Sequence, residues 1–309
     1  MSRGETWKET TAYWGYRGME SLAKSLPESI GYRAFSAFGR IGHATMDGVR
    51  ATVAANQAHV LGLPLDDERV RLSTREAFEL YARYWYDTFR LHSLPPDVVD
   101  AKTDMVDVHH IDRALEQGKG VICALPHMGN WDMGGRWFAA NGYRIAAVAE
   151  ELKPQRLTEL FVRHREAFGL RVIPLSKNGH VGQQLKQLLS ENWMVALVAD
   201  RDLGSRGIEV EMFGAPRRLP AGPALLSITS GAPLILTPVF TMPRGWQVRI
   251  SPPLEFERTG DTKTDVRALT RVMAAEFERS IAANPPDWHM FQPAWDDAPS
   301  RERTPIPAP

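Results

Sequence analysis

The stretch GVICALPHMGNWDMGG, residues 120–135, passes from one kind of local structure to another within a few positions. Its first part, GVICAL at 120–125, carries no charge and has the composition of a short strand buried on both faces. Pro126 ends this run, and Asn130 is a favourable N-cap for a helix that starts directly after it. A buried strand, a short turn and a helix form the repeating unit of a parallel sheet covered by helices, so the stretch predicts an α/β fold.

The same alternation continues on both sides of this stretch. Strands are predicted at 105–109, 120–125, 143–149, 171–175 and 193–199, and later at 208–213, 233–240 and 246–251. Helices are predicted at 111–117, from 130, and at 154–168, 179–190, 221–230 and 264–283. The early strands are apolar throughout, which is typical of parallel strands, whereas the later strands could run in either direction.

The first hundred residues are predicted to be helical. Apolar residues recur at helical spacing between Ile30 and Ile41. Ser73 and Glu76 have the spacing of a capping box, which predicts the start of a long helix at this point.

Together these patterns predict a single α/β domain at 1–295, with a central mostly parallel or mixed sheet flanked by helices and a helical N-terminal part at 1–100. The proline-rich end, 296–309, is predicted to be a disordered tail. The uncharged window 219–243 contains five prolines, so it indicates a short helix and a strand. No membrane-spanning helix is predicted.

The overall composition excludes several classes of protein. Lysine plus arginine (37) balance aspartate plus glutamate (37), so no overall positive field favours a nucleic acid partner. The single cysteine, Cys123, cannot form an internal disulfide, and the first ten residues lack the apolar core of a secretory signal. These features predict a protein of a reducing, cytosolic compartment.

Polar residues follow the predicted strand ends. His127 comes after the strand at 120–125, Glu150 after the next strand, and Asp200 after the strand at 193–199. Because the carboxyl ends of parallel strands meet at one edge of a sheet, and ligands bind there, we expect these three residues to converge on a site.

His127 has the features of a general base. Asp132 falls in the first turn of the predicted helix, where its charge is favoured and where it could hold one ring nitrogen of His127. The other nitrogen could then accept a proton, which contributes roughly 10² to 10⁴ in rate. The His-x4-Asp spacing alone is weak, but Gly129, Gly134 and Gly135 would let a substrate approach the backbone.

Motifs for other chemistries are missing from the sequence. There is no G-x-S-x-G elbow, and Cys123 lies within a buried strand, so no covalent nucleophile stands out. No histidine or cysteine spacing supplies three metal ligands, since His109 and His110, adjacent on a predicted strand, would point to opposite faces. What remains is direct attack by a substrate hydroxyl, deprotonated by His127, on an activated acyl carbonyl.

Several blocks then resemble one family. HMGNWD at 127–132 resembles the His-x4-Asp block of the lysophospholipid-type acyltransferases, in the branch that contains the lipid A late acyltransferases. The blocks REAFG at 165–169, DRD at 200–202 and PPDWHMFQPAW at 285–295 resemble that branch in the same order. The sequences of the last two blocks are most similar to those of the actinobacterial phosphatidylinositol mannoside acyltransferases.

The resemblance implies the reaction. It implies transfer of a long acyl chain, palmitoyl by expectation, from acyl-CoA to a mannose hydroxyl of a phosphatidylinositol mannoside. It implies no cofactor and no metal, and a peripheral enzyme on the cytoplasmic face of the plasma membrane.

The resemblance also implies site residues. His127 is the base, Asp132 belongs to the signature pair, and Arg165 and Asp200 belong to the site. Asp132 or Asp200 could pair with His127, and Asp132 has the position of a residue that stabilises the start of a helix. Without the resemblance, the default for Arg165 would be a solvated basic helix face.

Other residues have two readings. Glu150 could bind sugar hydroxyls or belong to a charged loop, and Arg201 and Asp202 could contact substrate or form an ion pair that shapes the loop. Trp288 is expected to pack in the core. The aromatic residues of the first sixteen positions could contact a membrane or dock onto the sheet.

Three alternatives to the mannoside reaction remain open. The acceptor could be that of a lipid A-type or other lysolipid acyltransferase. A base beside a thioester could also activate water, as in an acyl-CoA thioesterase, and the fold could serve a lipid-binding protein without catalysis.

Overall fold

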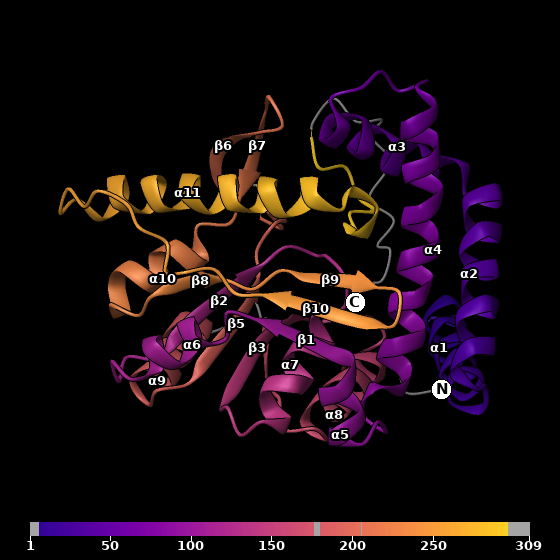
Figure 1. Cartoon of the computed structure of the whole chain (residues 1–309), viewed down its shortest axis with the longest axis horizontal. Coiled ribbons are helices and arrows are strands. Elements are labelled where there is room, and N and C mark those ends of the chain that lie inside the picture. Colours follow the sequence, from indigo (N-terminus) through magenta and orange to yellow (C-terminus); the bar gives the residue numbers. More distant parts are fainter. Residues whose placement is uncertain (1–5, 176–179, 205, 296–309) are drawn as a thin grey trace.

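The buried strand predicted at 120–125 is one of five strands in the central sheet. The computed structural model describes residues 6–175, 180–204 and 206–295. The strands have the order β4 (Arg171–Leu175), β3 (Ile145–Glu150), β5 (Met194–Val198), β2 (Val121–Leu125) and β8 (Leu234–Leu236). All neighbours pair in parallel, which confirms the predicted parallel sheet (Figure 1).

The two faces of this sheet are covered by different helices. Alternate residues such as Ile122 and Val195 pack with α9 (Val181–Ser190), α10 (Gly222–Ser230) and α11 (Thr262–Ala283). We call this the α9/α10 face.

The intervening residues of the same strands, Cys123 and Met194 among them, face the other way. They pack with α6 (His109–Leu115) and α7 (Trp131–Ala140), and we call this the α7 face. The period of two along each strand therefore divides the core into two layers.

Two smaller sheets flank the central one. β1 (Thr103–Val106) pairs in parallel with β10 (Gly245–Arg249), which pairs antiparallel with β9 (Val239–Met242). β6 (Ile208–Met212) and β7 (Ala215–Leu219) form a hairpin. The predicted strand 233–240 is thus wrong as one element, because Pro238 separates β8 from β9 and the two join different sheets.

The N-terminal part is helical, as predicted. It contains α1 (Trp7–Ser25), α2 (Glu28–Thr45), α3 (Asp47–Leu61), α4 (Glu68–Leu91) and α5 (Pro96–Lys102), and α2 runs beside α4 (Figure 1). The predicted capping box at Ser73 is wrong, because the N-cap of α4 is Asp67 and the Ser73 hydroxyl is buried against Gln57, at 2.6 Å.

Two further sequence expectations change. β1 ends at Val106, since Asp107 has a φ of 61°, and His109 and His110 begin α6 instead of lying on a strand.

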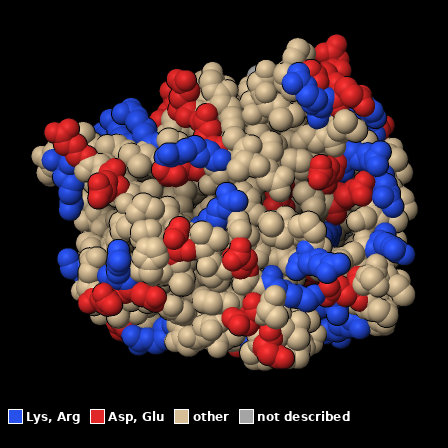
Figure 2. Space-filling view, viewed as in Figure 1, with Lys and Arg blue, Asp and Glu red and all other residues tan. Residues whose placement is uncertain are grey.

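Among the described residues, no helix is long and apolar enough to cross a bilayer. The predicted tail at 296–309 lies outside the described residues. On the face shown in Figure 2, basic and acidic side chains are interspersed.

Candidate active site

The ends of three neighbouring strands bring His127, Asp200 and Glu150 to one edge of the central sheet. His127 and Asp200 are in direct contact, with Nδ1 of the imidazole 2.5 Å from Oδ1 of the carboxylate. The backbone N–H of His127 also donates to Oδ2 of Asp200 at 3.0 Å. The alternative left open by the sequence is therefore resolved: Asp200 is the partner of His127.

Asp200 is fully buried, yet its surroundings favour the charged form. Trp288 donates its indole N–H to Oδ2 of Asp200 at 2.8 Å, and Arg217 donates to the main-chain oxygen of Asp200 at 2.6 Å. Burial alone would raise the pKa of Asp200, but the charge and hydrogen bond of His127, the Trp288 bond and Arg217 hold it well below its usual range. A permanent carboxylate at Nδ1 leaves Nε2 of His127 as the nitrogen that can accept a proton.

Asp132 has a different partner. Asn130 caps α7 by accepting from the N–H of Met133 at 3.1 Å, so Asp132 lies in the first turn as expected. Its carboxylate binds Arg165 through two hydrogen bonds, Nε to Oδ1 at 2.7 Å and Nη2 to Oδ2 at 2.9 Å. Tyr84 adds a third contact at 3.3 Å. Pairing of Asp132 with His127 is therefore wrong, since the helix turns this carboxylate toward α8 (Gln155–Glu166) and α4.

Arg165 is buried, and a solvated basic face is the wrong description of it. Burial alone would lower the pKa of Arg165, but the Asp132 carboxylate raises it above its ordinary value. The bidentate pair joins α7 to α8 beside His127, and both members line the adjoining cavity.

The remaining predicted site residues divide into two groups. Arg201 pairs with Glu150 at 3.0 Å, and both line the cavity. Asp202 instead accepts the backbone N–H groups of Gly204 at 3.1 Å and Gly207 at 2.7 Å, so it shapes its own loop. The sequence left open an ion pair between Arg201 and Asp202, and in the structure Arg201 pairs with Glu150 instead.

The C-terminal segment 285–291 holds the histidine loop in place. The N–H of His289 donates to the carbonyl of His127 at 2.7 Å, and the N–H of Gly129 donates to the carbonyl of Asp287 at 3.0 Å. Trp288 belongs to the core, as expected, but its bond to Asp200 was missed from the sequence. The only sequence signal for it was the PPDWHMFQPAW block.

Gly129 is required by this arrangement. It has a φ of 59°, and a Cβ at this position would overlap the carbonyl of Val239. The turn between β2 and α7 can therefore approach β9 only with glycine.

A cavity of about 750 Å³ opens beside His127. Its lining is mainly apolar and comes from α7, from the strands β3 and β5, and from α9 and α10. The arrangement offers a base, held by a buried carboxylate, next to an apolar space. Such a site suits attack by a hydroxyl on an acyl group whose chain is buried.

Comparison with known proteins agrees with this chemistry. The model of the bacterial lipid A biosynthesis acyltransferase family matches residues 5–297. The chain belongs to this family. The resemblance inferred from the motif blocks is thereby confirmed, and the protein is an acyltransferase.

Two relatives are similar to this acyltransferase over most of their length. The phosphatidylinositol mannoside acyltransferase of Mycolicibacterium smegmatis is 36% identical over 285 residues, which are 91% of this chain and 90% of that protein. That of Mycobacterium tuberculosis strain H37Rv is 37% identical over 292 residues, 93% of this chain and 89% of that protein.

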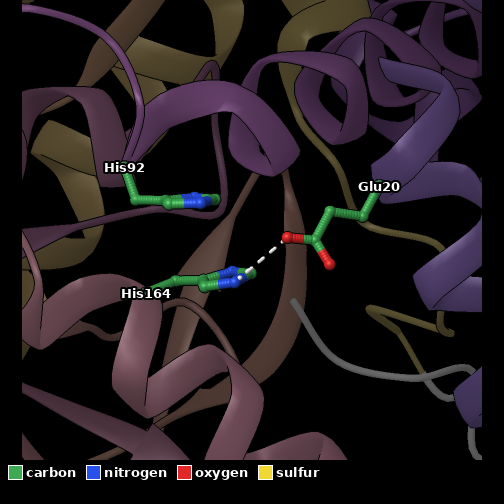
Figure 3. A group of neighbouring side chains, drawn as sticks. All are labelled: Glu20, His92 and His164. Carbon is green, nitrogen blue, oxygen red and sulfur yellow. Dashed lines mark ion pairs between the residues drawn. The ribbon is translucent and has the colours of Figure 1, made fainter. Parts of the chain in front are cut away.

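A second cluster of polar side chains joins three helices of the acyltransferase. Glu20 of α1, His92 after α4 and His164 of α8 offer ligand atoms within 4.8 Å of one another (Figure 3). However, the two imidazole rings are stacked, with centroids 4.1 Å apart and planes at 11°, so their in-plane lone pairs do not converge on one point. Lys24 also binds Glu20 at 2.7 Å. The geometry is that of an ion-paired cluster and does not fit a metal centre.

Proposed function

We propose that this acyltransferase transfers palmitoyl from its CoA thioester to a mannose hydroxyl of a phosphatidylinositol mannoside. The names of the two mycobacterial relatives support the acceptor class. The observation that carries the proposal is the His127–Asp200 pair at the rim of an apolar cavity, because it places a base where a long acyl chain can be buried.

In the proposed reaction, Nε2 of His127 removes the proton of the mannose hydroxyl as its oxygen attacks the thioester carbonyl. The tetrahedral oxyanion collapses with loss of the CoA thiolate, which takes the proton from the imidazolium, and an ester remains on the sugar. Asp200 stabilises the imidazolium between these steps, as in other carboxylate–histidine pairs.

Candidate donors to the oxyanion lie at the start of α7. The N–H groups of Met128 and Gly129, which the glycine-rich turn offers first, already donate to Pro126 and Asp287. The first N–H groups of a helix have no partner inside it, so those of Trp131 and Asp132 are candidates.

The acyl chain of the donor is proposed to enter the part of the cavity on the α7 face. Gly134 and Gly135 of α7 and the buried side chains of Phe138 and Ile145 line this part. Two consecutive glycines cost helix stability, about 1 kcal/mol each, and they leave this stretch of the cavity wall without side chains.

Peripheral contact with the cytoplasmic face of the plasma membrane completes the proposal. Trp7 and Trp14 of α1, seven residues apart, are 75% and 63% exposed, and Ile41 of α2 is 58% exposed. Large apolar side chains along exposed helices suit shallow insertion among lipid head groups. Sedimentation with vesicles should show weaker binding for Trp14→Ala than for the wild type, and equal binding would remove this part of the proposal.

The test is mass spectrometry of the lipid products formed from palmitoyl-CoA and a panel of acceptors. The panel holds a phosphatidylinositol mannoside, a lysophospholipid and a lipid A precursor, and we expect a palmitoylated mannoside that the folded His127→Ala variant does not form. Acylation of another acceptor would point to a lipid A-type or lysolipid enzyme. Release of CoA without acylated lipid would indicate a thioesterase, and lipid binding without turnover a non-catalytic protein.

A further inference from the structure

The cavity beside His127 is lined from both faces of the central sheet. Neighbouring residues of β3, Ala147 and Val148, both line it, as do Ala196 and Leu197 of β5. Ala147 and Ala196 pack in the layer of the α7 face, whereas Val148 and Leu197 pack in the layer of the α9/α10 face. The cavity therefore has two parts that meet around the carboxyl ends of β3 and β5.

The two parts differ in their access to solvent. Phe138, Ile145 and Met194, which line the part on the α7 face, are buried. The part between α9 and α10 has an apolar rim made of Leu175, Leu203 and Leu225. These three leucines are 42%, 48% and 45% exposed. Single exposed leucines are ordinary, but three around one opening mark a place where an apolar ligand enters.

The cavity is larger than a single acyl chain. A methylene group is about as large as a water molecule, which takes ~30 Å³ in the liquid. A sixteen-carbon chain then needs on the order of 500 Å³, and the cavity measures about 750 Å³. The donor chain alone therefore does not fill the cavity.

We propose that the part between α9 and α10 binds a fatty chain of the phospholipid acceptor, while the part on the α7 face holds the chain that is transferred. This inference rests on the proposed function. Two chains entering from opposite faces of the sheet place the acceptor head group and the thioester together at the strand ends, beside His127. Lys186 also lines the cavity from α9, and its charge suits the anionic phosphodiester that such an acceptor carries.

Gly182 provides a specific way to close this part. It lies on α9 and lines the cavity, and a Cβ added there meets no atom of the described residues within 4 Å. Gly182→Phe is designed to place a ring in the opening, and the helix gains a better helix former. Gln184→Phe is the matched control, since Gln184 is exposed on the same helix and does not line the cavity.

The experiment compares two acceptors that carry the same mannosides. One is the diacyl phosphatidylinositol mannoside, and the other is its deacylated form, which has no fatty chains. For Gly182→Phe we expect KM for the diacyl acceptor to rise about tenfold or more, a typical effect of a filled apolar pocket. KM for the deacylated acceptor and for palmitoyl-CoA should stay within about twofold, and Gln184→Phe should match the wild type.

Two results would overturn the inference. A rise in KM for palmitoyl-CoA with both acceptors would assign this part to the donor, and unchanged constants would mean that no substrate uses it. Binding of the diacyl lipid to His127→Ala, with and without Gly182→Phe, gives a readout that needs no turnover and must weaken with the phenylalanine. Failure of the wild type to acylate either acceptor would instead contradict the proposed function, and this binding comparison would still decide the inference.

Discussion

Asp200 accepts hydrogen bonds on both carboxylate oxygens, and this limits what can replace it. Oδ1 faces Nδ1 of His127, and Oδ2 faces the N–H groups of His127 and Trp288. An amide has only one accepting oxygen. If that oxygen stays with the two N–H groups, the amide NH₂ faces Nδ1 of His127 and forces the imidazole proton onto Nε2, where it blocks the base.

For this reason Asp200→Asn should lower kcat for acyl transfer by roughly 10³ to 10⁴, the size of effect that a wrong histidine tautomer has in a comparable pair. KM should change little, because the carboxylate does not touch the cavity. Steady-state kinetics on the purified variant, with its thermal unfolding checked against the wild type, gives the answer. A folded variant with nearly normal kcat would show that Asp200 does not orient the base.

The ion pair of Asp132 with Arg165 is expected to affect the stability of the fold, whereas Asp200 is expected to affect kcat. Removing one member of a buried ion pair leaves the other charge unpaired, which typically costs about 3–5 kcal/mol. Asp132→Asn should therefore lower the free energy of unfolding by an amount of this order, as measured by urea denaturation. The double variant Asp132→Leu with Arg165→Met should recover most of the loss. A cost below about 1 kcal/mol for the single variant would mean that the pair does not hold α7 on α8.

At the scale of elements, α7 follows the turn that carries His127 and forms one wall of the cavity. Gly135 and Leu170 line the cavity, and a Cβ added at Gly135 makes ordinary contacts with Leu170, at 3.7 Å, so we expect a larger side chain at this position to reduce the space for the donor chain. Gly135→Leu should shift the preferred donor from sixteen carbons to a shorter acyl-CoA. The check is the ratio of kcat/KM for a series of acyl-CoA lengths, and an unchanged preference would place the donor chain elsewhere.

The turn before α7 can be tested with two matched glycines. Gly129 and Gly62 have φ values of 59° and 62°, but a Cβ at Gly62 meets no atom within 4 Å. Gly62→Ala should cost about 1 kcal/mol from backbone strain alone, whereas Gly129→Ala adds the overlap with Val239 and should cost about 3 kcal/mol or more. Equal losses in urea unfolding would show that the turn can move away from β9.

Elements were predictable where local chemistry decides them. The parallel strands, Asn130 as a cap and the strand-end positions of His127, Glu150 and Asp200 follow from composition and periodicity. The split at Pro238 and the sheet that each later strand joins depend on packing between distant segments, which no local pattern contains. The choice of Asp200 over Asp132 likewise depends on how α7 faces α8, a tertiary fact. Trp288 could be expected in the core but not on a carboxylate 88 residues away.

The stability of the whole molecule depends on pH because buried groups bind protons differently in the folded and unfolded states. As the pH falls, buried His164 lowers stability, whereas buried Asp87 and Asp287 raise it. Burial and the neighbouring His92 lower the pKa of His164 to about 4. The unfolded chain therefore binds a proton at this residue below about pH 6.5 that the folded protein does not, so His164 costs stability as the pH falls from 6.5 to 4. Burial raises the pKa of Asp87 to about 7 and of Asp287 to about 6, and these groups have the opposite effect in the same range.

Because these contributions cancel in part, the prediction concerns a difference. Relative to the wild type, the unfolding free energy of His164→Gln should rise by up to about 1.4 kcal/mol for each unit by which the pH falls between 6.5 and 4. Urea titrations of both proteins at pH 7, 6 and 5 measure it. Parallel curves for the two proteins would mean that His164 is protonated in the folded cluster with Glu20.

The position of the segment 285–291 also affects when activity can begin. Translation makes His127 and Asp200 long before Trp288 and His289, yet the later residues supply the bonds that fix the earlier pair. A nascent chain on the ribosome thus contains His127 and Asp200 before it contains the residues that hold them in place. A chain that ends before this segment lacks the bonds of Trp288 and His289, so we expect it to be inactive in the proposed reaction.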